Sequence, residues 1–196
     1  MESEIAVLRQ VAREIRESTE ESGYKVGVAV RQHGAFSQTR GPASALERSL
    51  VLEAARRGAS QAGLTFEAAS GSLDIITNCG DTIRYYRVKH VKLTAAGEYK
   101  VICGEGSSLL VTEPESLLRE EKWILGYTLS DDHTIERLIA AEIVGWRGEG
   151  PVCLTLGSII VLTDDPSPRG FTSTDEDLPG FEDEDGDGEI GDASGF

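Results

Sequence analysis

Hydrophobic residues at the start of the chain recur at helical spacing. In the segment ESEIAVLRQVAREIRES, residues 2–18, glutamate and arginine fill the polar positions, and the apolar positions are Ile5, Leu8, Val11 and Ile15. This stripe predicts an amphipathic helix. The next segment, YKVGVAVRQ at residues 24–32, alternates valine with Lys, Gly and Ala, which predicts a strand.

A second helix is expected near residues 44–62. Ser44 is followed three residues later by Glu47, which is the spacing of a reciprocal helix cap. Gly63 ends the pattern, as glycine commonly does after the last turn of a helix. The amino-terminal third of the chain is therefore expected to supply two helices.

From Leu64 onward, short β-branched and aromatic runs are separated by turn residues, which is typical of antiparallel strands. We expect strands near residues 73–78, 82–93, 98–103, 107–112, 122–130, 135–146 and 151–162. A short helix is expected from Thr112, with Pro114 in its first turn. Residues 135–146 also fit one helical face, but turn-like residues on both sides favour a strand.

Two helices followed by strands indicate an α+β domain, residues 1–163, built on a curved antiparallel sheet or a small, partly open β-barrel. Three strands, a short helix and further strands is also the order of barrels that bind oligonucleotides or oligosaccharides on one face. Trp123 and Trp146 lie within apolar strands, so both are expected in the core.

The negative charge is concentrated at the carboxyl terminus. The whole chain has a formal net charge of −15, and residues 164–196 hold 12 acidic residues against one basic residue, Arg169. Few apolar groups and a high like charge predict that residues 164–196 form a disordered acidic tail. The rest of the chain, with a net charge of −4, is close to neutral.

The composition also bears on location. No apolar run approaches the roughly 18 residues of a membrane span, so no membrane association is expected. The three cysteines, Cys79, Cys103 and Cys153, are scattered and odd in number. This usage favours a reduced, cytoplasmic protein.

The segment IRYYRVKHVKL, residues 83–93, combines bases with aromatic residues. Such a mixture can neutralise phosphates and stack bases. We therefore expect a binding surface for single-stranded nucleic acid or another polyanion, made of Arg84, Tyr86, Arg87, Lys89 and Lys92. The alternative is an ordinary half-buried strand, with tyrosine packed inside and basic residues on the wet face.

The acidic tail carries isolated aromatic residues, of which Phe181 and the terminal Phe196 are the expected anchors. Carboxylates and phenylalanine can compete with phosphates and bases for one cationic surface, so the tail is expected to regulate binding or to recruit a protein partner. In composition it resembles the acidic tails, ending in phenylalanine, of the single-stranded-DNA-binding proteins of bacteria and their phages. Those proteins carry an Asp-rich run immediately before the last aromatic residue, and this chain has GDASGF at that place.

Metal binding and catalysis find less support in the sequence. Positions 1, 3, 5, 6 and 8 of a calcium loop are matched by Asp183, Asp185, Asp187, Gly188 and Ile190. Ser194 replaces the bidentate glutamate, so neither a metal nor a cofactor is expected. His133 beside Asp131 and Asp132, or a Cys/His pair, leaves a small cytoplasmic enzyme as an alternative. A non-catalytic binding or adaptor protein is favoured.

Overall fold

The computed structural model describes residues 2–69, 71–104, 107–110, 119–148 and 151–163. Contacts divide the chain into two units, Met1–Asp165 and Pro166–Phe196, and all the described residues belong to the first. The predicted acidic tail, with Phe181, Phe196 and the partial calcium loop, lies outside the described residues. So does most of the helix predicted from Thr112.

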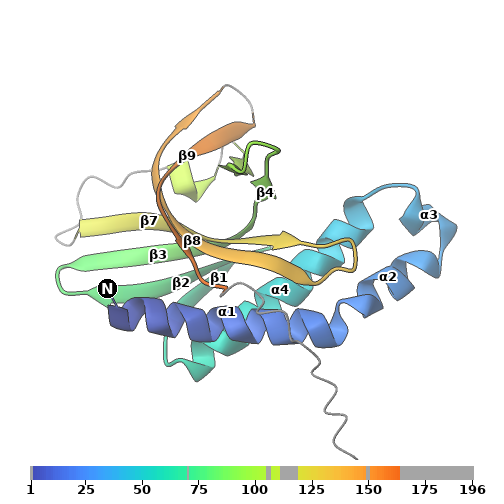
Figure 1. The fold of residues 1–196 in the computed structure, drawn as a ribbon, viewed down its shortest axis with the longest axis horizontal. Helices are drawn as coiled ribbons and strands as arrows, with labels where there is room; N and C mark the ends of the chain where they lie inside the picture. The colour runs from blue at the N-terminus through green and yellow to red at the C-terminus, as the bar shows by residue number, and fades with distance from the viewer. Residues whose placement is uncertain (1, 70, 105–106, 111–118, 149–150, 164–196) are drawn as a thin grey trace, which may run out of the picture. The chain divides into compact units, whose positions relative to one another are not determined.

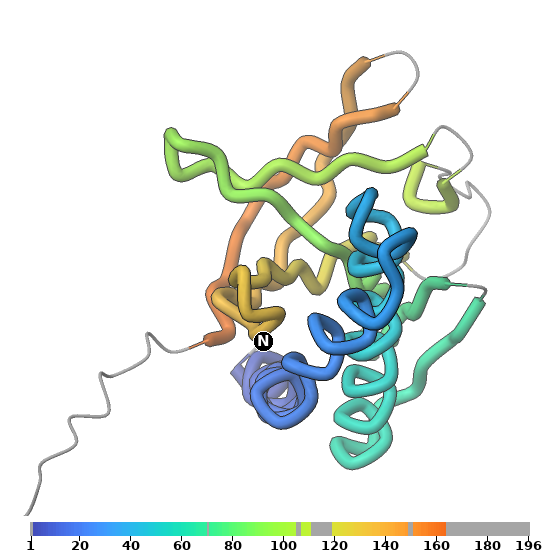
Figure 2. The backbone as a smooth tube through the Cα atoms, turned by 90° about the vertical axis from the view of Figure 1, so that its right-hand side faces the viewer, coloured from blue at the N-terminus to red at the C-terminus, as the bar shows by residue number. Residues whose placement is uncertain are grey.

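Helices occupy the amino-terminal part of the described chain: α1 (Glu2–Ser22), α2 (Tyr24–Arg31), α3 (Gly34–Ser37) and α4 (Gly41–Gln61). The predicted stripe of α1 is confirmed, because Leu8, Val11 and Ile15 are all buried. The two long helices pack against each other beneath one face of the sheet (Figures 1 and 2). They approach closely at Gly58, where an added Cβ would lie 3.0 Å from the Cα of Val11.

The strand predicted at residues 24–32 is wrong, because this segment forms α2. Val26 is buried, whereas Val28 is 43% exposed, so the alternation of valines does not produce one buried strand face. A helix satisfies its own backbone hydrogen bonds, but a strand needs a partner. Gly23, in a helical conformation, lets the chain turn directly from α1 into α2.

The strands form one curled sheet of seven in the order β1-β2-β3-β7-β8-β9-β6, and a separate pair, β4-β5 (Figure 1). Their bounds are β1 Thr65–Ala69, β2 Ser72–Cys79, β3 Thr82–His90, β4 Lys92–Leu93, β5 Tyr99–Lys100, β6 Ile102–Cys103, β7 Arg119–Leu129, β8 Ile135–Arg147 and β9 Val152–Val161. The predicted α+β fold with amino-terminal helices and a curved sheet is confirmed. The sheet is mixed, however, because β3 and β7 are parallel.

Other differences follow from local chemistry. The ambiguous residues 135–146 are a strand, β8, as predicted, whereas β1 was not predicted. The strand predicted at 107–112 is wrong where the chain is described, since Ser108–Leu110 is a 3-10 helix, η1. There the backbone N–H of Leu109 donates to the hydroxyl of Ser107 at 3.4 Å. Serine often competes with extended structure in this way.

The sheet is buried on both faces near β7. Trp123, Leu125 and Tyr127 point into the core beneath α1 and α4, and Ile124 points into a second core beneath β6 and η1. Trp123 is buried as predicted, but the prediction for Trp146 is wrong, because its side chain is 49% exposed. None of the helices in the described ranges is long and apolar enough to span a membrane.

Candidate functional site

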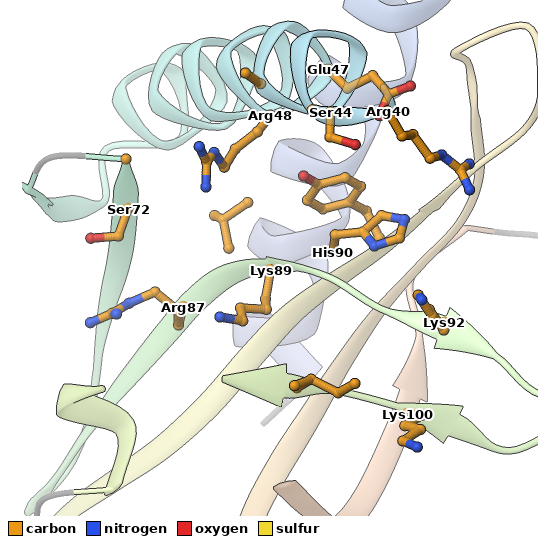
Figure 3. Close-up of a pocket in the computed structure, with 16 residues that line it drawn as sticks. Arg40, Ser44, Glu47, Arg48, Ser72, Arg87, Lys89, His90, Lys92 and Lys100 are labelled. Carbon is orange, nitrogen blue, oxygen red and sulfur yellow. The ribbon is translucent and has the colours of Figure 1, made fainter. Parts of the chain in front are cut away.

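A cavity of about 490 Å³ opens between the first turns of α4 and the end of β3. This volume falls in the range of small-molecule and cofactor sites. The walls come from α4, β3, the β4-β5 hairpin, β6 and β7, together with the turn at Gly71. Among the described residues that line it, six are cationic: Arg40, Arg48, Arg87, Lys89, Lys92 and Lys100 (Figure 3).

The path of the chain after β3 explains why these cations converge. The backbone N–H of Val91 donates to Tyr127 at 2.9 Å, and the chain then leaves the large sheet. Lys92 pairs instead with Lys100 in the β4-β5 hairpin. The cavity therefore collects cations from β3 itself and from the connection that follows it.

Arg87 is held in place by an ion pair within the sheet. Its guanidinium donates to both carboxylate oxygens of Asp74, at 2.6 Å for Nη2 and Oδ2, and also donates to the hydroxyl of Ser108 at 2.9 Å. Such a bidentate pair fixes the plane of the guanidinium. Asp74 offsets part of the charge that Arg87 brings to the cavity.

Lys89 is half-buried between other cations. Burial lowers the pKa of its ammonium group, and the charges of Arg87 and Arg48 lower it further, with an opposing influence from Cys103. A lysine in these surroundings gains from a nearby anion, because the anion would offset both the desolvation and the repulsion.

The remaining cations have no ion pair within the described part of the chain; they are Arg40, Arg48, Lys92 and Lys100. Lys92 and Lys100 are direct partners across the β4-β5 ladder. Like charges at opposing positions of a ladder are destabilising. An anion bound between the two lysines would turn this destabilising repulsion into a stabilising attraction.

Glu47 is the one carboxylate among the described lining residues. Its Oε1 lies 2.7 Å from Nδ1 of His133, in the turn between β7 and β8. His133 has a φ of 63°, which few residues other than glycine adopt. The turn thus presents the imidazole to α4, and Glu47 is already engaged on that side.

Tyr127 contributes a neutral donor to the cavity. Its side chain is 3% exposed and lines the cavity, and its hydroxyl forms no hydrogen bond with another described residue. Burial raises the pKa of the phenol to about 12, with the charge of Glu47 adding to the shift and Arg48 opposing it, so the hydroxyl keeps its proton at neutral pH. The ring of His90 lies edge-on to it at 5.5 Å between centroids.

The surroundings of His90 also favour its uncharged form. Burial lowers its pKa, Glu47 opposes this shift, and Lys92 and Arg40 reinforce it. The middle of the cavity therefore offers uncharged hydrogen-bonding groups rather than a further cation.

Three of the five residues predicted from residues 83–93 meet in this cavity, namely Arg87, Lys89 and Lys92. The other two, Arg84 and Tyr86, face α1. The guanidinium of Arg84 donates to Glu4 at 2.6 Å and to Glu121 at 2.7 Å, and the hydroxyl of Tyr86 donates to Glu4 at 3.0 Å. A binding role for Arg84 and Tyr86 stays a prediction.

The surroundings of Glu4 raise the pKa of both of its titratable partners on β3. Burial and the charge of Glu4 raise the pKa of Tyr86. For Arg84, burial lowers the pKa, but the hydrogen bond and charge of Glu121, together with Glu4, give a net increase. Both side chains are therefore locked in their hydrogen-bonding forms. The ring of Trp123, 5.4 Å from the guanidinium, completes the enclosure of Arg84.

The catalytic alternatives gain no geometric support among the described residues. His133 pairs with Glu47, which the sequence did not suggest. Burial and a hydrogen bond with Glu4 raise the pKa of the Cys79 thiol, which makes it a poor nucleophile. No cluster of three or more metal-ligating side chains occurs in the part of the chain that was described.

The lining residues that were not predicted include Arg40, Arg48, Lys100 and Tyr127. Arg48 follows Ser44 by four residues, so helical spacing alone puts these two on one face of α4. Similarly, the turn at Gly97 could have suggested that Lys100 returns opposite Lys92. No local pattern indicates that this helix face lies over the end of β3.

Comparison of the chain with models of protein families, with curated proteins and with solved structures gave no significant match. The function proposed below therefore rests on the cavity and its charges.

Proposed function

We propose that this protein is a non-catalytic, cytoplasmic binding protein that holds an anionic ligand in the cavity between α4 and β3. The observation that supports this is the convergence of six cationic side chains on a cavity whose described lining contains one carboxylate, Glu47, which is already paired with His133. The three cysteines are free thiols, in keeping with a reducing compartment.

The ligand class follows from the donors. Guanidinium and ammonium groups in a partly desolvated cavity form charge-assisted hydrogen bonds that favour phosphate or carboxylate groups. Aromatic rings beside them, those of His90 and Tyr127, suit a ligand that also has a flat or polar organic part. Single-stranded nucleic acid, or another polyanion, is the ligand we expect.

We further propose that the acidic tail, residues 164–196, regulates this binding. Its net charge of −11 makes it a competitor for any cationic cavity, and Phe181 and Phe196 are its proposed anchors. When a polyanion occupies the cavity, the tail is released and can recruit a protein partner.

Fluorescence anisotropy of a labelled oligothymidylate, titrated with the full chain, tests the binding. The double variant Arg48→Gln/Lys92→Gln should bind at least about tenfold more weakly, because two phosphate contacts are lost. The slope of log affinity against log salt concentration should become about 1.4 less steep, because each phosphate contact with a single strand contributes about 0.7 and two contacts are lost.

The matched control is Arg9→Gln/Arg13→Gln, which removes the same charge from the exposed face of α1. If both double variants weaken binding equally, net charge and not the cavity is responsible, and the proposed site is wrong. If the wild-type chain binds no oligonucleotide or polyphosphate at low salt, the proposed function is wrong. A chain ending at residue 163 should bind more tightly than the full chain if the tail competes.

A further inference from the structure

The cations of the cavity form two separate groups (Figure 3). At one end, the charges of Arg48 and Arg87 act on Lys89. At the other end lie Arg40 and Lys92 (Figure 3), and Lys100 is opposite Lys92 in the β4-β5 pair. The cavity is therefore positive at two ends rather than uniformly.

Each end lacks a full complement of negative charge. At the first end, Asp74 pairs with Arg87, which leaves Arg48 and Lys89 without an ion pair among the described residues. At the second end, no described carboxylate forms an ion pair with Arg40, Lys92 or Lys100. Repulsion within each group remains, and one anionic group at each end would relieve it.

The middle of the cavity has a different character. Val88 and Tyr127 line the cavity and are buried, and the hydroxyl of Tyr127 keeps its proton and can donate it to a ligand. Glu47 also lines the cavity, close enough for its charge to influence the pKa of both Tyr127 and His90. A carboxylate disfavours a third anionic group at this point and can accept a hydrogen bond from a neutral one.

We propose that the ligand carries two anionic groups joined by an uncharged part that both donates and accepts hydrogen bonds. This is the chemistry of a phosphate–nucleoside–phosphate unit, either as a free nucleoside 3′,5′-bisphosphate or as one unit within a single strand. One phosphate lies with Arg48 and Lys89, and the other with Lys92 and Lys100. The inference rests on the proposed function and narrows it to a two-ended ligand.

The dimensions agree with this assignment. Lys89 and Lys92 are three residues apart in an extended stretch of chain, so their Cα atoms are separated by about 10 Å. Long, flexible side chains can bring the charged groups closer together or further apart. A nucleoside lies between the two phosphates of one such unit, and its hydroxyl and base groups would meet Tyr127 and Glu47.

Isothermal titration calorimetry of the full chain with thymidine 3′,5′-bisphosphate, thymidine 5′-monophosphate and inorganic phosphate tests the inference. The bisphosphate should bind at least about tenfold more tightly than the monophosphate. Arg48→Gln removes a cation from one end of the cavity, and Lys92→Gln removes one from the other. Each variant should lower the affinity for the bisphosphate towards that for the monophosphate. Both residues are exposed, so the variants should fold, and Arg9→Gln is the control.

Tyr127→Phe probes the middle of the cavity. This variant should lower the affinity for both thymidine ligands by a similar factor and leave the affinity for inorganic phosphate unchanged. Equal affinity for mono- and bisphosphate, or sensitivity to only one end, would overturn the two-ended inference while leaving the anion-binding function in place. Loss of all binding, oligothymidylate included, would overturn both.

An oligothymidylate identifies the source of the unit. If it binds much more tightly than the free bisphosphate and depends on both ends, the unit belongs to a strand. If the free bisphosphate binds as well as the oligomer, a small ligand is the natural occupant. Both results support a two-ended ligand.

Discussion

Glu4, in the first turn of α1, forms an ion pair with Arg84 of β3 at 2.6 Å, and their side chains are 5% and 15% exposed. The same carboxylate accepts hydrogen bonds from Thr77 at 2.5 Å and from Tyr86 at 3.0 Å. Its desolvation is thus offset by three donors and a positive charge. These bonds attach the beginning of the chain to β2 and β3.

Replacing Glu4 with alanine should lower the free energy of unfolding by about 3 kcal/mol, because it leaves a largely buried guanidinium with one fewer partner and two hydroxyls without an acceptor. Urea denaturation followed by circular dichroism measures the change. Glu17, exposed on the same helix, provides the control, since Glu17→Ala should stay within about 0.5 kcal/mol of the wild type. Equal changes would show that the hydrogen bonds and ion pair of Glu4 add no net stability.

The same cluster predicts sensitivity to acid. For Glu4, burial raises the pKa, but hydrogen bonds from Thr77, Cys79 and Tyr86 and the charge of Arg84 give a net decrease. For Glu121, the hydrogen bond from Arg84 lowers the pKa more than burial raises it. In acid, the unfolded chain therefore binds more protons than the folded one, and stability falls as pH falls.

This contribution should be complete above the ordinary glutamate pKa of about 4.3 and lost as pH drops through the lowered folded values. Urea midpoints measured between pH 7 and pH 3 should decline, and Glu4→Gln should decline less steeply. Parallel curves for the two proteins would contradict the assignment of this pH dependence to Glu4.

Gly23 lies where α1 and α2 meet the turn between β7 and β8. A Cβ at this position would lie 2.6 Å from the backbone oxygens of both His133 and Thr19. Gly23→Ala should therefore destabilise the protein by about 1–3 kcal/mol through overpacking, even though alanine is the better helix former. Thermal denaturation checks this.

Gly34→Ala is the matched control for Gly23→Ala, because an added Cβ at Gly34 meets no atom within 4 Å. This variant should be neutral or slightly more stable. If Gly23→Ala were equally well tolerated, the junction between α1 and α2 would have to be looser than its contacts indicate.

The charge of Lys89 should lower the stability of the free protein and raise its affinity for anions. Its pKa is lowered by burial and by two arginines, so without a ligand its charge opposes folding until pH rises above the lowered pKa. Lys89→Met keeps the length of the side chain and removes the charge. It should raise the free energy of unfolding by about 1 kcal/mol at neutral pH.

The stability gain from Lys89→Met should shrink as pH rises from the lowered pKa of Lys89 through the ordinary lysine pKa of about 10.4, above which the wild-type side chain is neutral in both states. Anion affinity should fall at neutral pH. Lys25→Met, on the exposed side of α2, is the control and should change neither quantity. A destabilised Lys89→Met variant would mean that this ammonium group has a stabilising partner within the folded protein.

The sequence predicted those elements whose buried face could be determined locally. The α1 stripe is one example, and β8 another, because flanking turns decided between helix and strand. The strand prediction for residues 24–32 was wrong because alternating valines form a strand only where a partner strand is available. Whether a partner is available depends on the tertiary fold and not on the local sequence. Trp146 was misplaced for a related reason, since an apolar strand does not by itself specify what covers it.

The site was predictable in part. The sequence identified the basic segment that supplies Arg87, Lys89 and Lys92, but it could not say which of its residues the helices cover. Nor could it bring Arg40, Arg48 and Tyr127 to the end of β3, since these contacts join segments about 40 residues apart. Glu4 illustrates the same limit, because it reads as one more surface acid in α1.

The parallel pairing of β3 with β7 separates the structure into parts that can change independently. Parallel neighbours cannot be joined by a tight turn, so the chain must make a long excursion between His90 and Arg119. That excursion supplies Lys92 and Lys100, while Arg48 is anchored in the helical layer. Insertions or substitutions in the exposed β4-β5 hairpin of this connection would change one end of the cavity and leave the core between the helices and the sheet untouched.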